Sequence, residues 1–354
     1  MTDIRSRAHF KEDQFLAHVI ARESGSFVKR PKQSPLDCFV GPAFGGSPRN
    51  DKVVSIDWDY LIEKAKSEGV FYPFYKNLIS PDIACDTIPQ EFRDKFRQMY
   101  LSHIAQSENF ISQVTSLLDR LDALKIKILL FKGPTIDSLI YDGFYRPRID
   151  LDIVVKDEDS LVVKKALADG DPLRAHIHSH LINNTWLSAD NALAAVNMEK
   201  IWQETAMFKN YKNIFTLRPE MNILFLCEHA VKHDVDQLVF LYEIDRLIRF
   251  YGIRFDWRKF VALAEELGLG RIVYYGLYFT KEMLSGDIPD EILSRLKPEN
   301  FTIGERSFIA NTMNRKITRY SAYCVYLAAR KGMMKKVRFL FKMAFSRLRR
   351  SVLS

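Results

Sequence analysis

The sequence predicts an α+β protein in which a small mixed β-sheet core is flanked by N- and C-terminal helical regions. Three short stretches have the apolar or alternating pattern of strands, and they cover residues 125–131, 149–155 and 174–182. Apolar residues recur at helical spacing both before and after these stretches. The chain has 354 residues, of which 47% are hydrophobic, and this is enough to bury the core of two domains or of one large composite domain.

Helices are expected on the N-terminal side of the sheet. Residues 57–78 have apolar residues at helical spacing, and Asp57 suits the N-cap position. Residues 91–124 repeat this spacing over a long run. Further upstream, a short helical pattern over residues 9–22 is followed by a stretch rich in Gly, Ser and Pro, which is typical of a loop.

Helix signals also separate the predicted strands and follow them. Gly133-Pro134 opens one helix because Pro suits the first helical turn, and residues 156–170 form another that ends at Gly170. Helical spacing returns over residues 219–233, 236–252 and 256–270. The predicted regions are an irregular N-terminal region (1–52), a helical region (53–124), the α/β core (125–215), a helical domain (216–300) and basic amphipathic C-terminal helices (301–354).

The net charge of +8 belongs to the C-terminal end. Residues 331–354 contain eight Lys and Arg residues and no Asp or Glu, so the rest of the chain is neutral overall. Within this tail, residues 335–350 have an amphipathic helical pattern with Val337, Leu340 and Phe341 on the apolar side. Such a helix can rest on an anionic membrane surface, bind RNA phosphates or dock on the body of the protein, and nucleic acid is the less favoured partner.

Cysteine usage and hydropathy indicate the compartment. The four cysteines, Cys38, Cys85, Cys227 and Cys324, lie far apart, which argues against a disulfide framework or a zinc ribbon and fits a reducing cytoplasm. The N-terminal residues lack an apolar signal core, and no window approaches the roughly 18 uninterrupted apolar residues of a membrane span. We expect a cytoplasmic protein that is attached to a membrane at most at its surface.

Two acidic residues on the second predicted strand are the candidate catalytic and metal-binding residues. Alternate side chains of a strand share a face, so Asp150 and Asp152 point the same way while Leu151 and Ile153 point into the core. Two such carboxylates stand roughly 6.5–7 Å apart at the backbone and can converge on one Mg²⁺ or bridge two ions. These ions neutralise the charge of a triphosphate and orient an attacking hydroxyl.

A Lys-Gly turn upstream adds candidate phosphate-binding residues. Gly133 lets the backbone approach a phosphate at the start of a helix, and Lys132 supplies a positive charge. Arg146 and Arg148 precede the acidic strand and can contact phosphate or pair with the aspartates. The alternative reading is a structural ion-pair cluster of these arginines and aspartates.

The complete pattern resembles a known family. Lys132-Gly133, Ile140-Tyr141 and Arg146-Pro147 through Asp150-Leu151-Asp152-Ile153-Val154-Val155 match the K-G, L-Y and R-P-x-x-D-I-D-L-L-V pattern of a bacterial nucleotidyltransferase family in the polymerase-beta superfamily. The resemblance extends over roughly residues 55–275, and includes His229, Lys232, His233 and Asp245 in a C-terminal helical segment. It implies a nucleotidyltransferase fold, Mg²⁺ with Mn²⁺ as an alternative, and a nucleoside triphosphate as substrate. Acceptors in this family are mostly unknown.

The third predicted strand departs from the superfamily pattern. A third acidic residue is expected on a neighbouring strand, but this strand carries His176, His178 and His180, which share one face by alternation. These histidines can replace the third carboxylate, bind a transition metal such as zinc, contact phosphate, or form a polar strand face. Imidazole is a poor Mg²⁺ ligand, and Asp171 lies too near a turn to be a confident third ligand.

His229 and His233 form a second histidine pair. They stand at i and i+4, so they share a helix face. The order EHAVKH is not HExxH, which excludes a zinc protease of that type. The pair either packs against the α/β core or contacts the nucleotide or the acceptor.

The leading hypothesis is a Mg²⁺-dependent enzyme that transfers a nucleoside monophosphate from a nucleoside triphosphate to an unidentified acceptor. Asp150 and Asp152 would hold metal, and Lys132, Gly133, Arg146 and Arg148 would handle phosphate. The first alternative is a catalytically decayed nucleotide-binding or scaffold protein, suggested by the missing third carboxylate. The second is a toxin-like transferase acting on tRNA, for which the basic tail is the support.

Overall fold

The structure is a computed structural model. It describes residues 56–78, 88–141, 146, 150–167, 173–181, 197–316, 318, 321–330, 332–334, 336–337 and 339–341, together with five helical residues between 13 and 20. Several sequence predictions lie outside the described residues: Arg148, Asp171, Gly170, Cys38, Cys85, most of the irregular N-terminal region and most of the basic tail.

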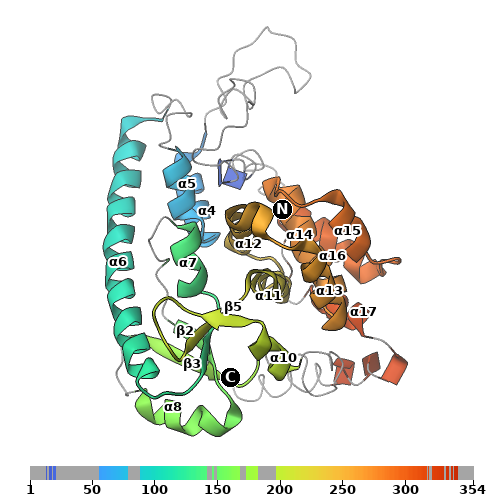
Figure 1. Ribbon diagram of the computed structural model, residues 1–354. Helices are drawn as coiled ribbons and strands as arrows, with labels where there is room; N and C mark the ends of the chain where they lie inside the picture. Colours follow the sequence, from blue (N-terminus) through green and yellow to red (C-terminus); the bar gives the residue numbers. More distant parts are fainter. Residues whose placement is uncertain are drawn as a thin grey trace.

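A five-stranded mixed sheet forms the centre of the fold, which confirms the predicted α+β class (Figure 1). The strand order is β3-β2-β1-β5-β4, with bounds β1 Ile128–Leu130, β2 Asp150–Val154, β3 Arg174–His178, β4 Thr205–Met207 and β5 Ile214–Leu217. The β1–β5 and β2–β3 pairs are parallel, whereas β1–β2 and β4–β5 are antiparallel. Strands β4 and β5 were not predicted, and the boundaries between the predicted regions stay a prediction.

Helices surround the sheet and continue beyond it. Before and within the sheet they are α4 (Trp58–Ser67), α5 (Phe71–Leu78), α6 (Gln90–Asp122), α7 (Pro134–Ile140), the short 3₁₀ helix η3 (Asp157–Asp159), α8 (Ser160–Ala166) and α10 (Met198–Gln203). After the sheet they are α11 (Pro219–Lys232), α12 (Leu238–Tyr251), η5 (Gly252–Arg254), α13 (Trp257–Glu266), α14 (Gly270–Leu284), α15 (Asp290–Leu296), α16 (Ile303–Met313) and α17 (Tyr323–Ala329).

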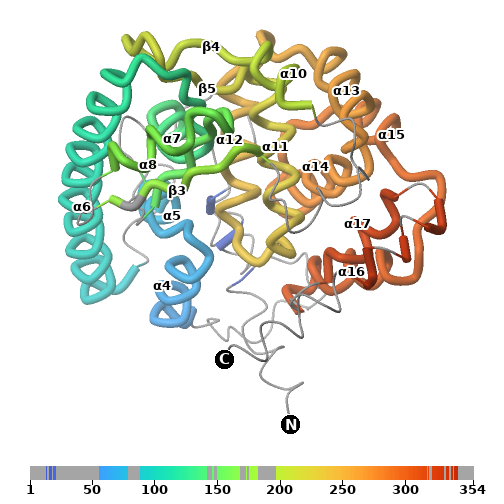
Figure 2. Tube along the Cα trace, turned by 90° about the horizontal axis from the view of Figure 1, so that it is seen from below, coloured from blue at the N-terminus to red at the C-terminus, as the bar shows by residue number. Residues whose placement is uncertain are grey.

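The two faces of the sheet belong to two different hydrophobic clusters. Leu151 and Ile153 of β2 pack in a cluster with α6 and α8, and the alternate residue Val154 belongs to the larger cluster with α7, α11 and α12. In Figures 1 and 2 the long helix α6 runs along one side of the sheet, and the C-terminal helices lie on the other. Asp150 and Asp152 alternate with Leu151 and Ile153, so they project toward the α11–α12 side.

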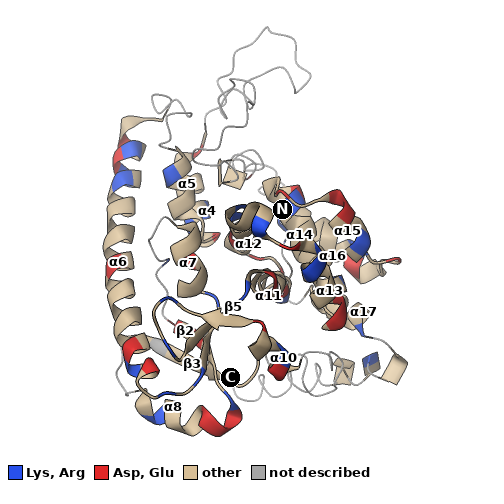
Figure 3. Cartoon of the chain, in the orientation of Figure 1, with Lys and Arg blue, Asp and Glu red and all other residues tan. Residues whose placement is uncertain are grey.

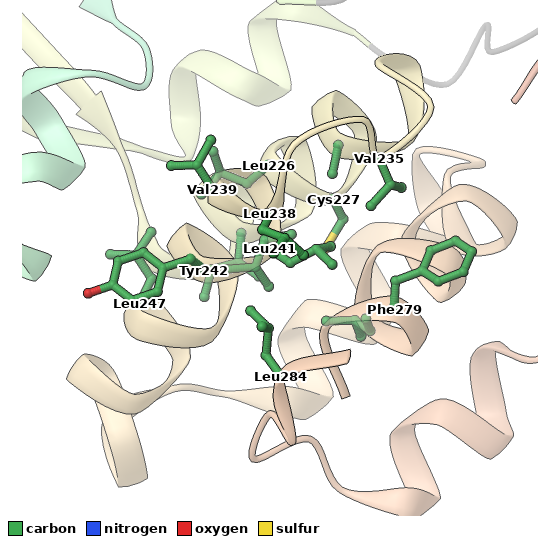
Figure 4. Close-up of a cluster of buried hydrophobic side chains, with 14 of the residues drawn as sticks. Leu226, Cys227, Val235, Leu238, Val239, Leu241, Tyr242, Leu247, Phe279 and Leu284 are labelled. Atoms are coloured by element: carbon green, nitrogen blue, oxygen red, sulfur yellow. The ribbon is translucent and has the colours of Figure 1, made fainter. Parts of the chain in front are cut away.

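The larger cluster is centred on three helices. Side chains of α11, α12 and α14 interlock, and among them Cys227, Leu241 and Phe279 are buried (Figure 4). Gly276 of α14 allows its helix to approach α11 closely, because a Cβ there would lie 2.5 Å from the Cβ of Cys227. This packing holds α11, and with it the histidine pair, against the sheet.

The helix expected over residues 57–78 is two helices instead of one. Asp57 caps α4 as predicted, since its side chain accepts a hydrogen bond from the Tyr60 N–H at 2.9 Å. The chain then turns at Gly69, where φ is +70° and a Cβ would lie 3.0 Å from Val239. The Val239 N–H of α12 donates to the Glu68 carbonyl at 3.1 Å. The break between α4 and α5 thus packs against a helix that is distant in the sequence, and the local spacing of apolar residues did not predict it.

One further element boundary was wrong, and another was not tested. Helix α8 ends at Ala166, but the predicted stop at Gly170 lies outside the described residues. Strand β3 ends at His178 instead of Ile182, because its pairing with β2 stops where β2 ends at Val154. His180 therefore lies beyond the strand, and alternation does not decide where its side chain points.

Charge on the described helices is mixed, as the balanced composition of the body implies. Figure 3 shows both signs along α6, α8 and α15. No helix within the described part of the chain is both long enough and apolar enough to cross a membrane.

The described part of the tail, between residues 332 and 341, packs against the body of the protein on one side and is exposed to solvent on another. Phe339 is buried, with the Arg330 guanidinium 3.6 Å from the centre of its ring. Several large apolar side chains at helical spacing are instead exposed, namely Met333, Met334, Val337, Leu340 and Phe341. Phe339 therefore anchors this segment to the body of the protein, while its other large apolar side chains form an exposed apolar face.

Candidate active site

The turn between β1 and α7 brings the predicted phosphate-binding residues to the sheet. Lys132 has φ 60° and Gly133 has φ 53°, so two successive residues occupy the left-handed region. Pro134 has no N–H, and the N–H groups of Thr135 and Ile136 donate to the Lys132 and Gly133 carbonyls. The start of α7 thus has few backbone N–H groups free to bind a phosphate. The Lys132 ammonium is therefore the main candidate in this turn for binding an anion.

One cavity of about 460 Å³ gathers most of the predicted site residues. Those that line it are Lys132, Gly133, Arg146, Asp150, Asp152, His178, His180, His229 and His233. His176 is not among its lining residues, and Arg148 lies outside the described residues. Residues separated by about a hundred positions in the sequence therefore share one cavity between the sheet and α11.

The two aspartates stand beside the histidines of β3. The register of the parallel pair sets Asp152 opposite His176. His178 Nε2 lies 3.0 Å from Asp152 Oδ1, and His176 Nδ1 lies 3.6 Å from Asp150 Oδ2. Burial on its own would raise the pKa of Asp152, but the hydrogen bond from His178 and the charge of Lys132 lower it below the ordinary value. Asp152 is therefore a carboxylate at neutral pH.

The side chains at this site fit a hard divalent cation that would be bound in part by phosphate oxygens. Mg²⁺ takes oxygen ligands and is commonly bound by one or two carboxylates plus substrate phosphates and water. Asp150 and Asp152 supply the carboxylates, whereas the neighbouring strand supplies imidazoles where a third carboxylate was expected. Within the described ranges, no three His, Cys, Asp or Glu side chains converge as a ready-made metal site. The protein's own residues thus fit Mg²⁺ with phosphate present better than they fit a closed zinc site.

The side chain of Lys132 contacts helix α11 within the cavity. Its Nζ lies 2.7 Å from His229 Nδ1 and 4.6 Å from the centre of the Phe131 ring. Burial lowers the pKa of Lys132 to about 8, and burial together with the Lys132 charge lowers the pKa of His229 well below its ordinary range. His229 is therefore a neutral acceptor for the lysine ammonium at pH 7.

Arg146 is fixed by two acidic residues from different elements. Its Nη2 lies 3.2 Å from Glu243 Oε1 of α12, and its backbone N–H donates to Asp137 Oδ2 at 3.1 Å. Glu243 and Asp137 are buried. These contacts hold Arg146 in place, and its side chain lines both this cavity and a second cavity beside α5 and α6.

The second histidine pair lies partly in the wall of the cavity. The rings of His229 and His233 are 4.5 Å apart, and both contact the Phe240 ring. Burial lowers the pKa of His233 to about 4, so this ring is also neutral at pH 7. Asp245, noted in the resemblance, is not among the lining residues described; it accepts a hydrogen bond from Arg249 at 2.9 Å.

Two further residues that line the cavity, Phe240 and Glu243, were not predicted as site residues, and both come from α12. Lys232 of α11, which the family resemblance included beside the two histidines, lines the cavity as well. Nothing in the local sequence marks Glu243, because its role depends on Arg146 almost a hundred residues away.

The fold and this cavity define a nucleotidyltransferase type of core: a mixed sheet, a Lys-Gly turn and two aspartates on strand β2. The comparison with protein families identifies the group. The model of a family described as uncharacterised nucleotidyltransferase matches residues 54–285, most of the chain, and the protein belongs to this family. Neither the curated proteins nor the solved structures that were compared with the chain gave a match. The family supports nucleotidyl transfer as the general activity.

Proposed function

We propose that the protein is a Mg²⁺-dependent enzyme that transfers a nucleoside monophosphate from a nucleoside triphosphate to an acceptor hydroxyl. The observation that carries this proposal is that two carboxylates, Asp150 and Asp152, line the same cavity as two cations, Lys132 and Arg146. Carboxylates for a metal and cations for phosphates are the two components that phosphoryl-group chemistry requires. The family supplies the reaction class.

Each group has a role that follows from its charge. Asp150 and Asp152 would hold Mg²⁺, which when bound neutralises phosphate charge and orients the reacting oxygens. Lys132 and Arg146 would bind the phosphate oxygens of the departing pyrophosphate. The acceptor oxygen forms a bond to the α-phosphorus, the bond to the β-phosphate oxygen breaks, and the hydroxyl proton passes to water. Asp152, with its lowered pKa, acts as a metal ligand and not as a proton donor.

A specific observation favours one alternative, a nucleotide-binding protein that has lost catalysis. Imidazoles stand beside both aspartates, and His178 already bonds Asp152 at 3.0 Å. If this arrangement replaces a carboxylate that catalysis needs, nucleotide binds with Mg²⁺ but does not react. The tRNA-directed transferase rests on the basic composition of the tail alone.

The test is nucleotide labelling of a cell extract. We expect the wild-type protein with each α-labelled nucleoside triphosphate and Mg²⁺ to transfer label to an acceptor, and Asp152→Asn to abolish the transfer. Asp157→Asn, an exposed acid just beyond the same strand, is the matched control and should label like wild type. Equal labelling by Asp152→Asn refutes the assignment, whereas Mg²⁺-dependent binding without labelling supports the non-catalytic alternative.

A further inference from the structure

A second cavity adjoins the candidate active site. Its volume is about 410 Å³, and it lies between α5, α6 and the C-terminal end of α7. Arg146 lines both cavities, so they meet within the reach of one side chain. Gly133 at the start of the seven-residue helix α7 lines the first cavity, and Tyr141 at its end lines the second. A short helix thus connects the phosphate-binding turn to this second cavity.

The walls of the second cavity are aromatic and uncharged or basic. Tyr72 is flanked by His103, at 5.4 Å between ring centres, and by Tyr141 at 6.0 Å. Burial and the charge of Arg146 lower the pKa of His103, so its ring is neutral at pH 7. Ser102 adds a hydroxyl from α6, and none of the described lining residues is Asp or Glu. These walls suit a planar, hydrogen-bonding ring, because ring stacking on aromatic side chains is favourable for every nucleobase.

The wall contains a buried hydroxyl, that of Tyr141. Tyr141 is 2% exposed, and its hydroxyl has no hydrogen-bond partner among the described residues. Buried hydroxyls are normally hydrogen-bonded, and one that is not needs an explanation. A ligand atom in the cavity that Tyr141 lines would satisfy this hydroxyl.

We propose that the second cavity binds the nucleobase of the nucleoside triphosphate, with Tyr141 as a hydrogen-bonding specificity residue. This proposal rests on the proposed function. A nucleoside triphosphate is elongated, with an anionic end and a ring end. The cavity with Lys132 and the aspartates matches the anionic end, the aromatic cavity matches the ring end, and Arg146 lies between them.

The experiment compares two ligands that differ in the ring end. Isothermal titration with the full chain measures the affinity for a non-reacting α,β-methylene nucleoside triphosphate of each base and for inorganic tripolyphosphate, both with Mg²⁺. We expect Tyr141→Phe to weaken binding of the preferred nucleotide roughly three- to tenfold, the effect of one lost hydrogen bond, and to leave tripolyphosphate unchanged. Tyr278→Phe, in α14 and stacked on Tyr274, is the matched control and should alter neither affinity.

A second variant keeps the test decisive. Ser102→Trp introduces a large side chain from an exposed position of α6 into the cavity, and should reduce nucleotide affinity more than tenfold while tripolyphosphate still binds. Thermal unfolding checks both variants. Tyr141→Phe removes a hydroxyl that bonds none of the described residues, and it should not destabilise the fold.

Two results would overturn the proposal, and they can be told apart. Wild-type nucleotide affinity in both Tyr141→Phe and Ser102→Trp, with tripolyphosphate binding intact, means that the base lies elsewhere and that this cavity serves another molecule such as the acceptor. No binding of either ligand to the wild-type protein removes the proposed function itself, and the base site with it.

Discussion

The Nζ of Lys132 lies 2.7 Å from Nδ1 of His229, which ties the β1–α7 turn to helix α11. The histidine is neutral, so it accepts a hydrogen bond from the ammonium without competing for an anion. Burial meanwhile lowers the pKa of Lys132 to about 8, close enough to neutrality for its charge to be lost at moderately alkaline pH. The candidate phosphate-binding cation is therefore both positioned and titratable.

Nucleotide affinity should fall as pH rises through the pKa of Lys132. Below pH about 8 the ammonium is charged and binds phosphate, and above it the neutral amine does not. We expect the affinity for a Mg²⁺-bound nucleoside triphosphate to fall up to roughly tenfold between pH 7 and pH 9, since one pKa unit changes the charged fraction about tenfold. Lys132→Arg stays charged and should flatten this part of the profile. The same fall in both proteins would show that another group titrates.

The lowered pKa of Lys132 also determines whether the stability of the folded protein rises or falls with pH. The folded protein releases the Lys132 proton near pH 8, whereas an unfolded lysine keeps it until about 10.5. Because the unfolded chain binds more protons in this window, the stability of the unliganded protein should rise with pH between these values. Chemical denaturation of wild type and Lys132→Met at pH 8 and pH 10 measures it, and the rise should be smaller in the variant.

A buried carboxylate in the C-terminal helical region should be important for stability. Glu305 accepts hydrogen bonds from Arg271 Nε at 2.7 Å and from the Tyr275 hydroxyl at 3.0 Å. We expect Glu305→Gln to destabilise the fold by about 2–3 kcal/mol, because Arg271 loses its charged partner. Glu265→Gln, which weakens an exposed pair with Arg295, is the control and should cost less than about 0.5 kcal/mol.

The pH dependence of the Glu305 effect has a defined direction. Burial would raise the pKa of Glu305, but its bonds to Arg271 and Thr302 lower it below the ordinary value. The stabilisation is present above the pKa of the unfolded carboxyl and is lost as pH falls through the lower folded value. Urea unfolding of wild type and Glu305→Gln should therefore give converging stabilities on acidification, and a constant difference down to pH 2 would contradict this account.

Close packing of α14 on α11 should make Gly276 intolerant of a side chain. A Cβ at this position would lie 2.5 Å from the Cβ and 2.8 Å from the Cα of Cys227, and backbone cannot move aside easily. We expect Gly276→Ala to cost about 2–3 kcal/mol or more in thermal or urea unfolding. Gly270→Ala in the same helix meets Leu296 at an ordinary 3.6 Å and should be neutral. Equal stability of the two variants would mean that the helices are farther apart.

The exposed apolar face of the tail offers a test of membrane attachment. Leu340 and Phe341 are 53% and 66% exposed, and in the sequence they lie among the basic residues of the tail. We expect the full chain to sediment with anionic phosphatidylglycerol vesicles but not with neutral phosphatidylcholine vesicles.

Substitutions test whether vesicle binding depends on the tail or on other exposed apolar residues. Leu340→Ser with Phe341→Ser should weaken anionic-vesicle binding at least roughly tenfold, since each apolar side chain buried contributes about 1.5–3 kcal/mol. Leu161→Ser, which changes a leucine that is 69% exposed on α8, is the control. Vesicle binding that is unaffected by the double substitution would assign this face to another partner or to none.

The strands and helices with strong local patterns were predictable. Strand β2 was read from its alternation, and the same alternation placed Asp150 and Asp152 on one face opposite Leu151. The cap at Asp57 and the long helix α6 follow from equally local signals. Strand β1 is as short but was recognised from its unbroken apolar run, whereas β4 and β5 are short and each contains a polar threonine, so neither stood out as a strand.

The sequence by itself determined the fold class and the candidate groups for metal and phosphate, because strand alternation and turn chemistry are properties of neighbouring residues. The tertiary structure alone decided which distant groups meet them: Lys132 with His229, Arg146 with Glu243, and Tyr141 with the cavity beside α5 and α6. Those meetings depend on how whole helices pack, as at Gly276 and Gly69, and no local pattern encodes a contact between elements that folding brings together.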